Sequence, residues 1–233
     1  MTILALLLMM VGVGDLIRGE VADQTRNRLA LAASTAVAIL GFWGLGLPWH
    51  QLWLPLIGLG LVGVWVFAEA IPFRAAERLS LVALCAAALA LLAFGQHLGR
   101  SIGWLDHWYE SLEIDALNGV SFDRFVFAVG CLVFLQNTAN VIVRLVLKGA
   151  GPGVMASSRT LKGGRILGPL ERIFIFAMGL TGQFAAIGAI IAAKGILRFP
   201  EISRDDADGN KAEYVLVGSF VSWLLALIFV PLF

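Results

Sequence analysis

Long apolar stretches, separated by short polar or charged segments, dominate the pattern along this chain. Seven of them approach the roughly 20 residues that a helix needs to cross the hydrocarbon core of a bilayer. They cover residues 1–17, 29–47, 52–71, 79–95, 125–147, 169–197 and 212–233. The pattern predicts an all-α fold, a polytopic helical membrane bundle of about seven transmembrane helices, in one integral membrane domain over residues 1–233.

The first stretch decides between seven spans and six. Residues 1–17 have no positively charged segment at their start and no small-residue cleavage signal, so we expect a retained helix and not a signal peptide. The stretch is also at the short end of the range for a span. If it does not cross, the other six helices keep their orientation and the N-terminus moves to the cytoplasm.

Composition supports the membrane assignment. Hydrophobic residues make up 59% and charged residues 14% of the 233 residues, whereas soluble domains have roughly 45–50% apolar and about 25% charged residues. The net charge of +1 gives no reason to expect a nucleic-acid partner. The expected partner is the lipid bilayer, with a second copy of the chain or another membrane subunit left open. Cys85 and Cys131 lie in apolar stretches and are predicted to be buried free thiols.

Basic residues gather in alternate loops. The loops after the first, third and fifth predicted helices are rich in Arg or Lys, and the loop between the fourth and fifth is acidic. By the positive-inside rule the basic loops, including residues 149–168, lie in the cytoplasm. The N-terminus is then outside if there are seven spans, and the C-terminus is cytoplasmic. The loop after the sixth helix carries both charges and argues weakly against this orientation.

Residues 101–118 are too polar to cross the bilayer, but Trp104, Leu105, Trp108 and Leu112 recur at roughly helical spacing. We expect a short interfacial helix on the outer side, at the level where Trp and Tyr are enriched. It either anchors the chain to the membrane surface or covers an outward-facing site.

Polar side chains inside the predicted fifth helix are the first candidate site. Gln136, Asn140 and Arg144 are spaced by four and therefore share one face. Uncompensated polar groups cost several kcal/mol in hydrocarbon, so this face should meet other helices or a wet cavity. Glu69 is at a similar predicted depth and is the expected partner of Arg144. Either these groups only join helices by hydrogen bonds, with Arg144 reaching the headgroups, or they line a polar pathway.

The predicted sixth and seventh helices extend this polar set. Pro169 and Glu171 suit the start of a helix, where the dipole favours an acidic residue. Lys194 and Glu213 either form an ion pair between the two helices or serve their own helix ends. The candidate intramembrane network is Glu69, Gln136, Asn140, Arg144, Glu171, Gln183, Lys194, Arg198 and Glu213. A stripe of small residues predicts close helix packing at Gly182, Ala186, Ala189 and Ala193.

No motif predicts a catalytic, metal or cofactor site. His50, His97 and His107 lack tight ligand spacing, and the acidic run at 205–209 lacks the spacing of an EF-hand loop. The sequence contains no P-loop, nucleophile elbow or CxxC motif. We therefore expect no metal, no cofactor and no enzymatic activity.

Four segments near the C-terminus carry a resemblance to a known family. They are GRILGPLER at 164–172, LTGQFAAIG at 180–188, AAKGILRF at 192–199 and AEYVLVGSF at 212–220. Together they resemble the C-terminal signature of a bacterial family of multi-pass membrane proteins of unknown function. Members of that family often have Ser in place of Gly195 and Thr in place of Ser219.

The resemblance covers residues 163–233, about 70 residues, and the first 160 residues do not clearly match. It implies a bacterial inner-membrane protein and no particular activity. It marks as residues to test Glu171, Arg172, Gln183, Lys194, Arg198 and Glu213.

Three functions fit these features. The favoured one is translocation of a small solute or ion through a polar pathway formed by the fifth to seventh predicted helices. The second is a non-catalytic membrane subunit or scaffold of a larger complex, because packing interfaces use the same residue types as pathways. The third is a lipid-modifying enzyme at the outer face that uses His97, Asp106 or His107, although no catalytic constellation is recognisable.

Overall fold

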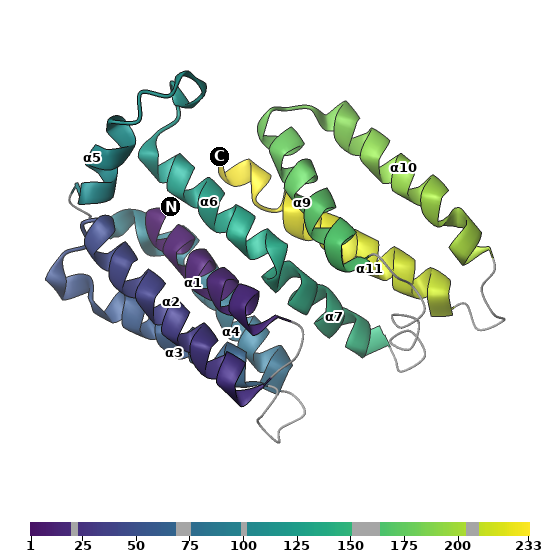
Figure 1. Cartoon of the computed structure of the whole chain (residues 1–233), viewed down its shortest axis with the longest axis horizontal. Coiled ribbons are helices and arrows are strands. Elements are labelled where there is room, and N and C mark those ends of the chain that lie inside the picture. The colour runs from purple at the N-terminus through teal and green to yellow at the C-terminus, as the bar shows by residue number, and fades with distance from the viewer. Residues whose placement is uncertain (20–22, 69–75, 99–101, 151–163, 204–209) are drawn as a thin grey trace. The chain divides into compact units, whose positions relative to one another are not determined.

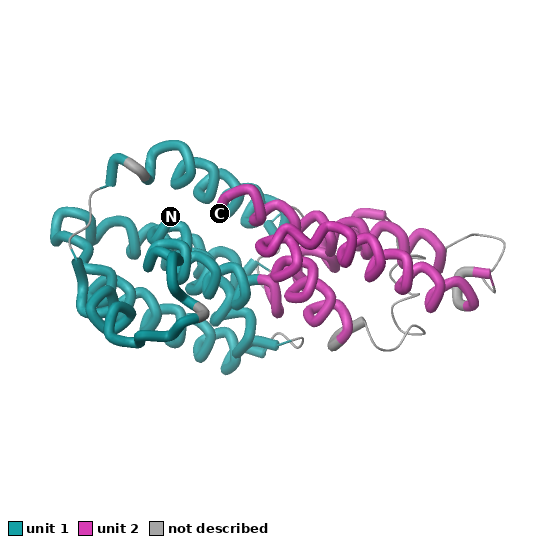
Figure 2. Tube along the Cα trace, turned by 90° about the horizontal axis from the view of Figure 1, so that it is seen from above, with its two compact units in different colours: residues 1–134 teal, residues 135–233 magenta. Residues whose placement is uncertain are grey.

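The structure is a computed structural model that describes residues 1–19, 23–68, 76–98, 102–150, 164–203 and 210–233. This part of the chain is helical and contains no strand (Figure 1), which confirms the predicted all-α class. It divides into two compact units, Met1–Phe134 and Leu135–Phe233 (Figure 2).

The first unit is built around its N-terminal helix. Its α-helices are α1 (Thr2–Arg18), α2 (Gln24–Gly44), α3 (Trp53–Phe67), α4 (Ala76–Phe94), α5 (Trp104–Glu110) and most of α6 (Phe122–Gln136). Short 3-10 turns occupy Trp49–Gln51, Gly95–His97 and Asp115–Leu117.

Helix α1 is buried along most of its length and packs against α2, α3 and α4. Where α6 crosses it, a Cβ on Gly130 would lie 2.9 Å from the carbonyl oxygen of Ala5. Backbones approach this closely in membranes only where a side chain is missing.

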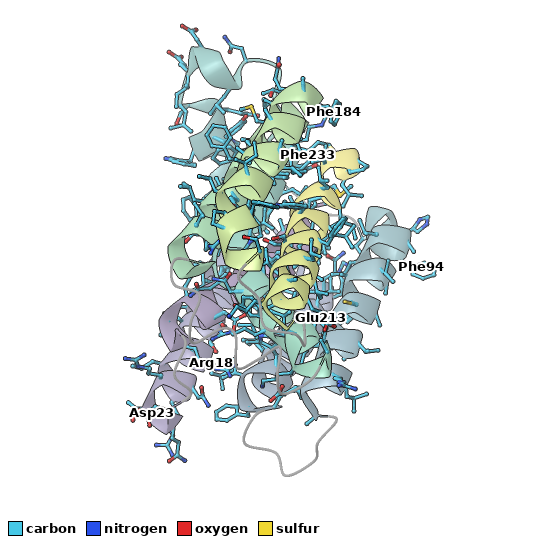
Figure 3. The ribbon with its side chains drawn as sticks, turned by 90° about the vertical axis from the view of Figure 1, so that its right-hand side faces the viewer. Arg18, Asp23, Phe94, Phe184, Glu213 and Phe233 are labelled. Carbon is cyan, nitrogen blue, oxygen red and sulfur yellow. The ribbon has the colours of Figure 1, made fainter. Side chains whose placement is uncertain are left out.

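Aromatic and charged residues lie at opposite ends of this unit. At one end the rings of Phe42, Trp43 and Trp49 meet edge to face, with centroids 5.3–6.1 Å apart. At the other end lie Arg18 and Asp23 (Figure 3). This separation is typical of a helical bundle whose ends sit at the two interfaces of a bilayer.

The segment at 101–118 contains the short helix α5 and the 3-10 turn Asp115–Leu117. Trp104 and Trp108 are both exposed, at 55% and 46%. The predicted helix is present, and its place at a membrane surface stays a prediction. Asp106 is buried, and its carboxylate accepts a hydrogen bond from the backbone N–H of Gly103 at 2.9 Å.

The described residues of the second unit form four α-helices and a final 3-10 turn. They are α7 (Thr138–Ala150), α9 (Gly164–Leu180), α10 (Phe184–Ile202), α11 (Asn210–Leu227) and the turn Val230–Leu232. Helix α11 packs against α7, α9 and α10, while α10 packs against α9 and α11. Phe184 and Phe233 lie toward one end of this unit and Glu213 toward the other (Figure 3).

The described residues hold fewer candidate spans than the seven predicted. Three helices are long and apolar enough to cross a membrane, over Trp49–Phe67, Ala76–Phe94 and Lys211–Leu232. A fourth is added if α6 and α7, which bend by 45° at their junction, count as one span. By length and composition the described part of the chain thus supports three or four spans, fewer than the seven predicted and than the alternative of six.

The first two predicted spans fail for different reasons. Helix α1 has only 17 residues and ends in the charged pair Asp15 and Arg18. Helix α2 is long enough, but its first turns contain Gln24, Arg26 and Arg28, and so its mean hydropathy is low.

The sixth predicted span, 169–197, is a hairpin of two helices. Helix α9 ends at Leu180 and α10 begins at Phe184. Between them Gly182 has φ +70°, its N–H donates to the carbonyl of Gly179, and the N–H of Gln183 donates to that of Met178. This is the Schellman arrangement that ends a helix with a glycine in the left-handed region.

The helix boundaries also change the role of two residues. Helix α9 starts at Gly164, so Pro169 lies inside the helix and not at its first position. Glu171 is therefore not a helix-start residue. Both cysteines are free as predicted, but Cys85 is exposed and only Cys131 is buried.

The hairpin can be tested by a distance measurement. In one continuous helix, residues 170 and 197 would be separated by about 40 Å, because each residue adds about 1.5 Å. In the hairpin they lie on neighbouring antiparallel helices, whose axes pack about 8–10 Å apart. We expect spin labels on Leu170→Cys and Leu197→Cys to give a distance well below 40 Å by double electron–electron resonance.

Both labelled positions are exposed, at 57% and 75%, and the native Cys85 and Cys131 would be replaced by alanine. A label pair at Leu79 and Phe94, within the single helix α4, serves as the control because it should give the full helical rise. A distance near 40 Å for the first pair would contradict the hairpin.

Candidate functional site

The candidate site lies where the bent helix pair α6 and α7 changes direction. Helix α6 ends at Gln136, Asn137 forms the turn, and α7 begins at Thr138. The final carbonyls of a helix lack intrahelical partners and carry the negative end of its dipole. A bend of this kind is tolerated at membrane depth only if other groups satisfy the backbone there.

Arg172 supplies those groups from helix α9. Its side chain is only 1% exposed. Its Nε donates to the carbonyl oxygen of Leu135 at 2.8 Å, and its Nη2 donates to that of Gln136 at 3.3 Å. The guanidinium thus binds the last two carbonyls of α6, where the helix dipole favours a positive charge.

Two side chains complete the acceptor set around Arg172. Its Nη2 donates to Asn140 Oδ1 on α7 at 2.7 Å, and its Nη1 donates to Ser222 Oγ on α11 at 2.9 Å. Asn140 in turn donates through Nδ2 to the carbonyl of Gln136 at 3.3 Å. One guanidinium therefore joins α6, α7 and α11 to α9.

A second charged cluster is formed by Glu171, which directly precedes Arg172 in the sequence, and Lys194. Lys194 on α10 donates to Glu171 Oε2 on α9 at 2.5 Å, and the two side chains are 16% and 8% exposed. The ammonium also lies 5.5 Å from the ring centroid of Trp223 on α11, a cation–π distance. This cluster ties the hairpin together and attaches it to α11.

The electrostatic balance of the two clusters is positive. Glu171 neutralises Lys194 and also interacts electrostatically with Arg172, whose hydrogen-bond acceptors in the described structure are all uncharged oxygens. A buried charge without a counter-ion is expensive unless hydrogen bonds and dipoles replace its hydration. Four acceptors and the end of α6 fill that role here, which is why each of them matters to the stability of the unit.

The structure brings together some of the predicted site residues. Gln136 and Asn140 meet at the bend, through a backbone carbonyl and a side chain respectively, and Glu171 pairs with Lys194. Lys194 therefore pairs with Glu171 and not with Glu213, which is exposed on α11.

Other predicted residues lie elsewhere. Arg144 and Arg198 are half-buried and interact electrostatically with the side chain of Tyr214, away from the bend. Gln183 is exposed in the turn of the hairpin. Glu69, the expected partner of Arg144, lies outside the described residues, as does most of the basic loop at 149–168.

The predicted small-residue stripe is divided by the turn. Gly182 belongs to the turn itself, and on α10 Ala186 is half-buried while Ala189 and Ala193 are exposed. Close helix packing at the exposed alanines stays a prediction.

From the sequence, Arg172 is marked only through the family resemblance, and Ser222 and Asp15 are not named as site residues. The role of Arg172 was hidden because an Arg next to a Glu at a presumed helix start looks like ordinary surface charge. Ser222 carries no sequence signal of its own. Asp15 did carry one, as a lone acid in an apolar stretch; it is 1% exposed and accepts hydrogen bonds from Trp65 Nε1 at 3.1 and 3.0 Å.

The chain was compared with protein-family models, with curated proteins and with solved structures, and no match was found in any of the three.

We expect that a lysine side chain cannot replace the buried guanidinium of Arg172. Arg172→Lys keeps the charge, but an ammonium cannot reach two carbonyls, an amide and a hydroxyl in one plane. We expect a loss of about 2–3 kcal/mol in unfolding free energy, because hydrogen bonds to charged groups contribute about 1.5–3 kcal/mol each. Reversible unfolding in mixed micelles measures this.

The matched control is Arg28→Lys, since Arg28 is exposed on α2. It should change the unfolding free energy by less than about 0.5 kcal/mol. Equal stabilities for the two variants would mean that the hydrogen bonds of Arg172 contribute nothing measurable.

Proposed function

We propose that this chain is a bacterial inner-membrane protein that translocates a small solute or an ion through its C-terminal unit. The observation that carries the proposal is the bent helix pair α6 and α7 with the buried Arg172 at its bend. The bacterial inner membrane is inferred from the resemblance at residues 163–233.

Two general properties of membrane proteins support a pathway here. Ionisable side chains within a bilayer are costly and commonly mark solute, ion or proton routes. Interrupted helices are common at the binding sites of transporters, where half-helix ends coordinate ions. The second unit combines both features within α7, α9 and α11.

The proposed pathway includes fewer of the predicted residues than the sequence analysis suggests. It includes Gln136, Asn140, Glu171 and Lys194, which lie in the two clusters, together with Arg172. Gln183 and Glu213 are left out because both are exposed and distant in the fold from the bend. Arg144 and Arg198 would lie at one mouth of the pathway.

A non-catalytic membrane subunit is the second candidate, and the exposure of α10 favours it. Ile196, Leu197 and Phe199 are 66–75% exposed, and the small residues Ala192, Ala193 and Gly195 just before them are also exposed. Lipid covers such a face as readily as a partner chain does. The enzyme hypothesis is not pursued, because Asp106 is engaged by the backbone of Gly103 and His97 and His107 are exposed.

The hairpin also bears on orientation. Lys148 at the end of α7, Arg198 near the end of α10 and Lys211 at the start of α11 all belong to the same end of the second unit, and Phe233 lies toward the other (Figure 3). By the positive-inside rule the basic end is cytoplasmic. We therefore propose an outside C-terminus, opposite to the orientation expected from seven spans.

A C-terminal reporter fusion tests this orientation. Alkaline phosphatase fused after Phe233 should be active, because the enzyme folds only outside the cytoplasm, and a fluorescent protein that folds only in the cytoplasm should be dark at the same position. The reverse pattern would place the C-terminus in the cytoplasm and count against the arrangement proposed here.

Flux through the purified protein tests translocation itself. Proteoliposomes would be challenged with Na⁺, K⁺ and proton gradients read by ion-sensitive dyes, and with small neutral solutes read by light scattering. We expect the wild type to pass at least one of these above the rate of empty liposomes. Glu171→Gln should change that rate at least about tenfold, since losing a buried charge partner shifts a barrier by more than 1.4 kcal/mol.

The control is Glu110→Gln, an exposed acid on α5, which should leave the rate unchanged. Absence of flux for every probe, in protein shown to be folded and inserted, would remove the proposal in favour of the subunit hypothesis. A constant amount of a second protein in the native preparation would point the same way.

A further inference from the structure

The hydrogen-bond acceptors around Arg172 have a chemistry that would also suit a metal cation. All four are oxygens, and none is charged: two backbone carbonyls from the end of α6, the amide oxygen of Asn140 and the hydroxyl of Ser222. Carbonyl, amide and hydroxyl oxygens are the ligands that hard cations prefer. In transporters, unwound carbonyls and half-helix C-terminal ends bind Na⁺ in this way.

A fifth oxygen at the bend has no partner. Thr138, the first residue of α7, is fully buried, and its Oγ1 makes no hydrogen bond within the described part of the chain. A buried hydroxyl in that state is costly and calls for an explanation. It is explained if the bend also serves a second occupant with more ligands than the guanidinium uses.

We propose that the bend between α6 and α7 is a binding site for an alkali-metal cation, and that Arg172 is a tethered cation which fills this site in the described conformation. The inference rests on the proposed function and names the class of ion that would be moved. Arg172 and a free cation would exclude each other, so binding of one requires the other to leave.

The absence of a carboxylate among the four oxygen ligands favours a monovalent over a divalent cation. Divalent cations such as Ca²⁺ and Mg²⁺ are bound in proteins through carboxylates. The nearest carboxylate in the sequence, Glu171, is engaged by Lys194 and is not among the ligands of Arg172. Neutral oxygens and a helix dipole, with Glu171 in electrostatic range but not in contact, suit a single positive charge, the same charge that Arg172 carries.

The backbone of α9 closes one side of the site. Gly168 lies one turn before Arg172 on α9, and a Cβ there would be 3.4 Å from Nη1 and 3.6 Å from Asn140 Oδ1. These are ordinary contact distances, so an exchange of Arg172 for a free cation requires the Arg172 side chain to swing away from this face of α9.

Removing the tethered cation should expose the site to salt. Arg172→Ala protein in nanodiscs would be melted in NaCl, KCl, LiCl and choline chloride at equal ionic strength. We expect its Tm to be lowest in choline and to rise with at least one alkali cation, by about 3–6 °C once that ion is at ten times its Kd. The wild type should respond little, because Arg172 occupies the site.

Matched double variants assign the effect to the site. Arg172→Ala with Ser222→Ala should lose most of the salt response, since one ligand is gone. Arg172→Ala with Ser203→Ala should keep it, because Ser203 is exposed at the end of α10. A salt response that survives the loss of Ser222 unchanged would overturn the proposal.

The remaining outcomes of the melting and flux experiments separate the cation site from the translocation proposal. Identical Tm values for Arg172→Ala in all four salts would overturn the proposal and leave Arg172 as a structural link. If that variant folds in none of them, Arg172→Gln is melted instead, with the same criterion. Flux in the wild type without a salt response in the variants would refute only this site, and a salt response without any flux would refute only the translocation proposal.

Discussion

A guanidinium that is cut off from water must find its hydrogen bonds inside the protein, and the second unit is arranged around this requirement. Arg172 donates to two carbonyls of α6, to Asn140 of α7 and to Ser222 of α11. The bend in α6 and α7 leaves those carbonyls without intrahelical partners, and Arg172 supplies the hydrogen bonds that they would otherwise lack. Helix α9 is connected to three other helices at once, because the side chain of its residue Arg172 contacts α6, α7 and α11.

The second charged cluster has a different physical basis. Glu171 and Lys194 neutralise each other across the hairpin, and Trp223 covers the ammonium from α11. An ion pair of this kind orients helices more than it stabilises them, because desolvation offsets most of the attraction. Helix α10 has few other ties to the unit, and most of its apolar side chains are exposed. Lys194 therefore links α10 to α9, while Arg172 links α9 to the bend and to α11.

Hydropathy predicted the apolar helices well and the interruptions poorly. The stretches at 79–95 and 212–233 agree with Ala76–Phe94 and Lys211–Leu232 to within a few residues. The stretch at 169–197 hid a turn, because three residues between two apolar runs barely lower the average and Gly182 looked like one more small residue. The same error led to the wrong partner for Lys194. In a straight helix Lys194 lies far from Glu171 and closer to Glu213 on the next helix, whereas the hairpin brings Lys194 and Glu171 together. Spacing by four did identify Asn140, but only tertiary structure could reveal that Arg172 is its partner.

The distribution of charge becomes consistent once the hairpin replaces the straight helix. With a single span over 169–197, the basic loop at 149–168 and the mixed segment after Phe199 fall on opposite sides of the bilayer, and the positive-inside rule is only partly obeyed. With α9 and α10 antiparallel, Arg198 and Lys211 return to the end of the unit where Lys148 lies. The polar residues Thr181 and Gln183 then lie at the opposite end, in a turn without any charge. A two-helix hairpin thus satisfies the hydrogen bonds of its own turn and keeps these basic residues at one end of the unit, whereas a single span would separate them.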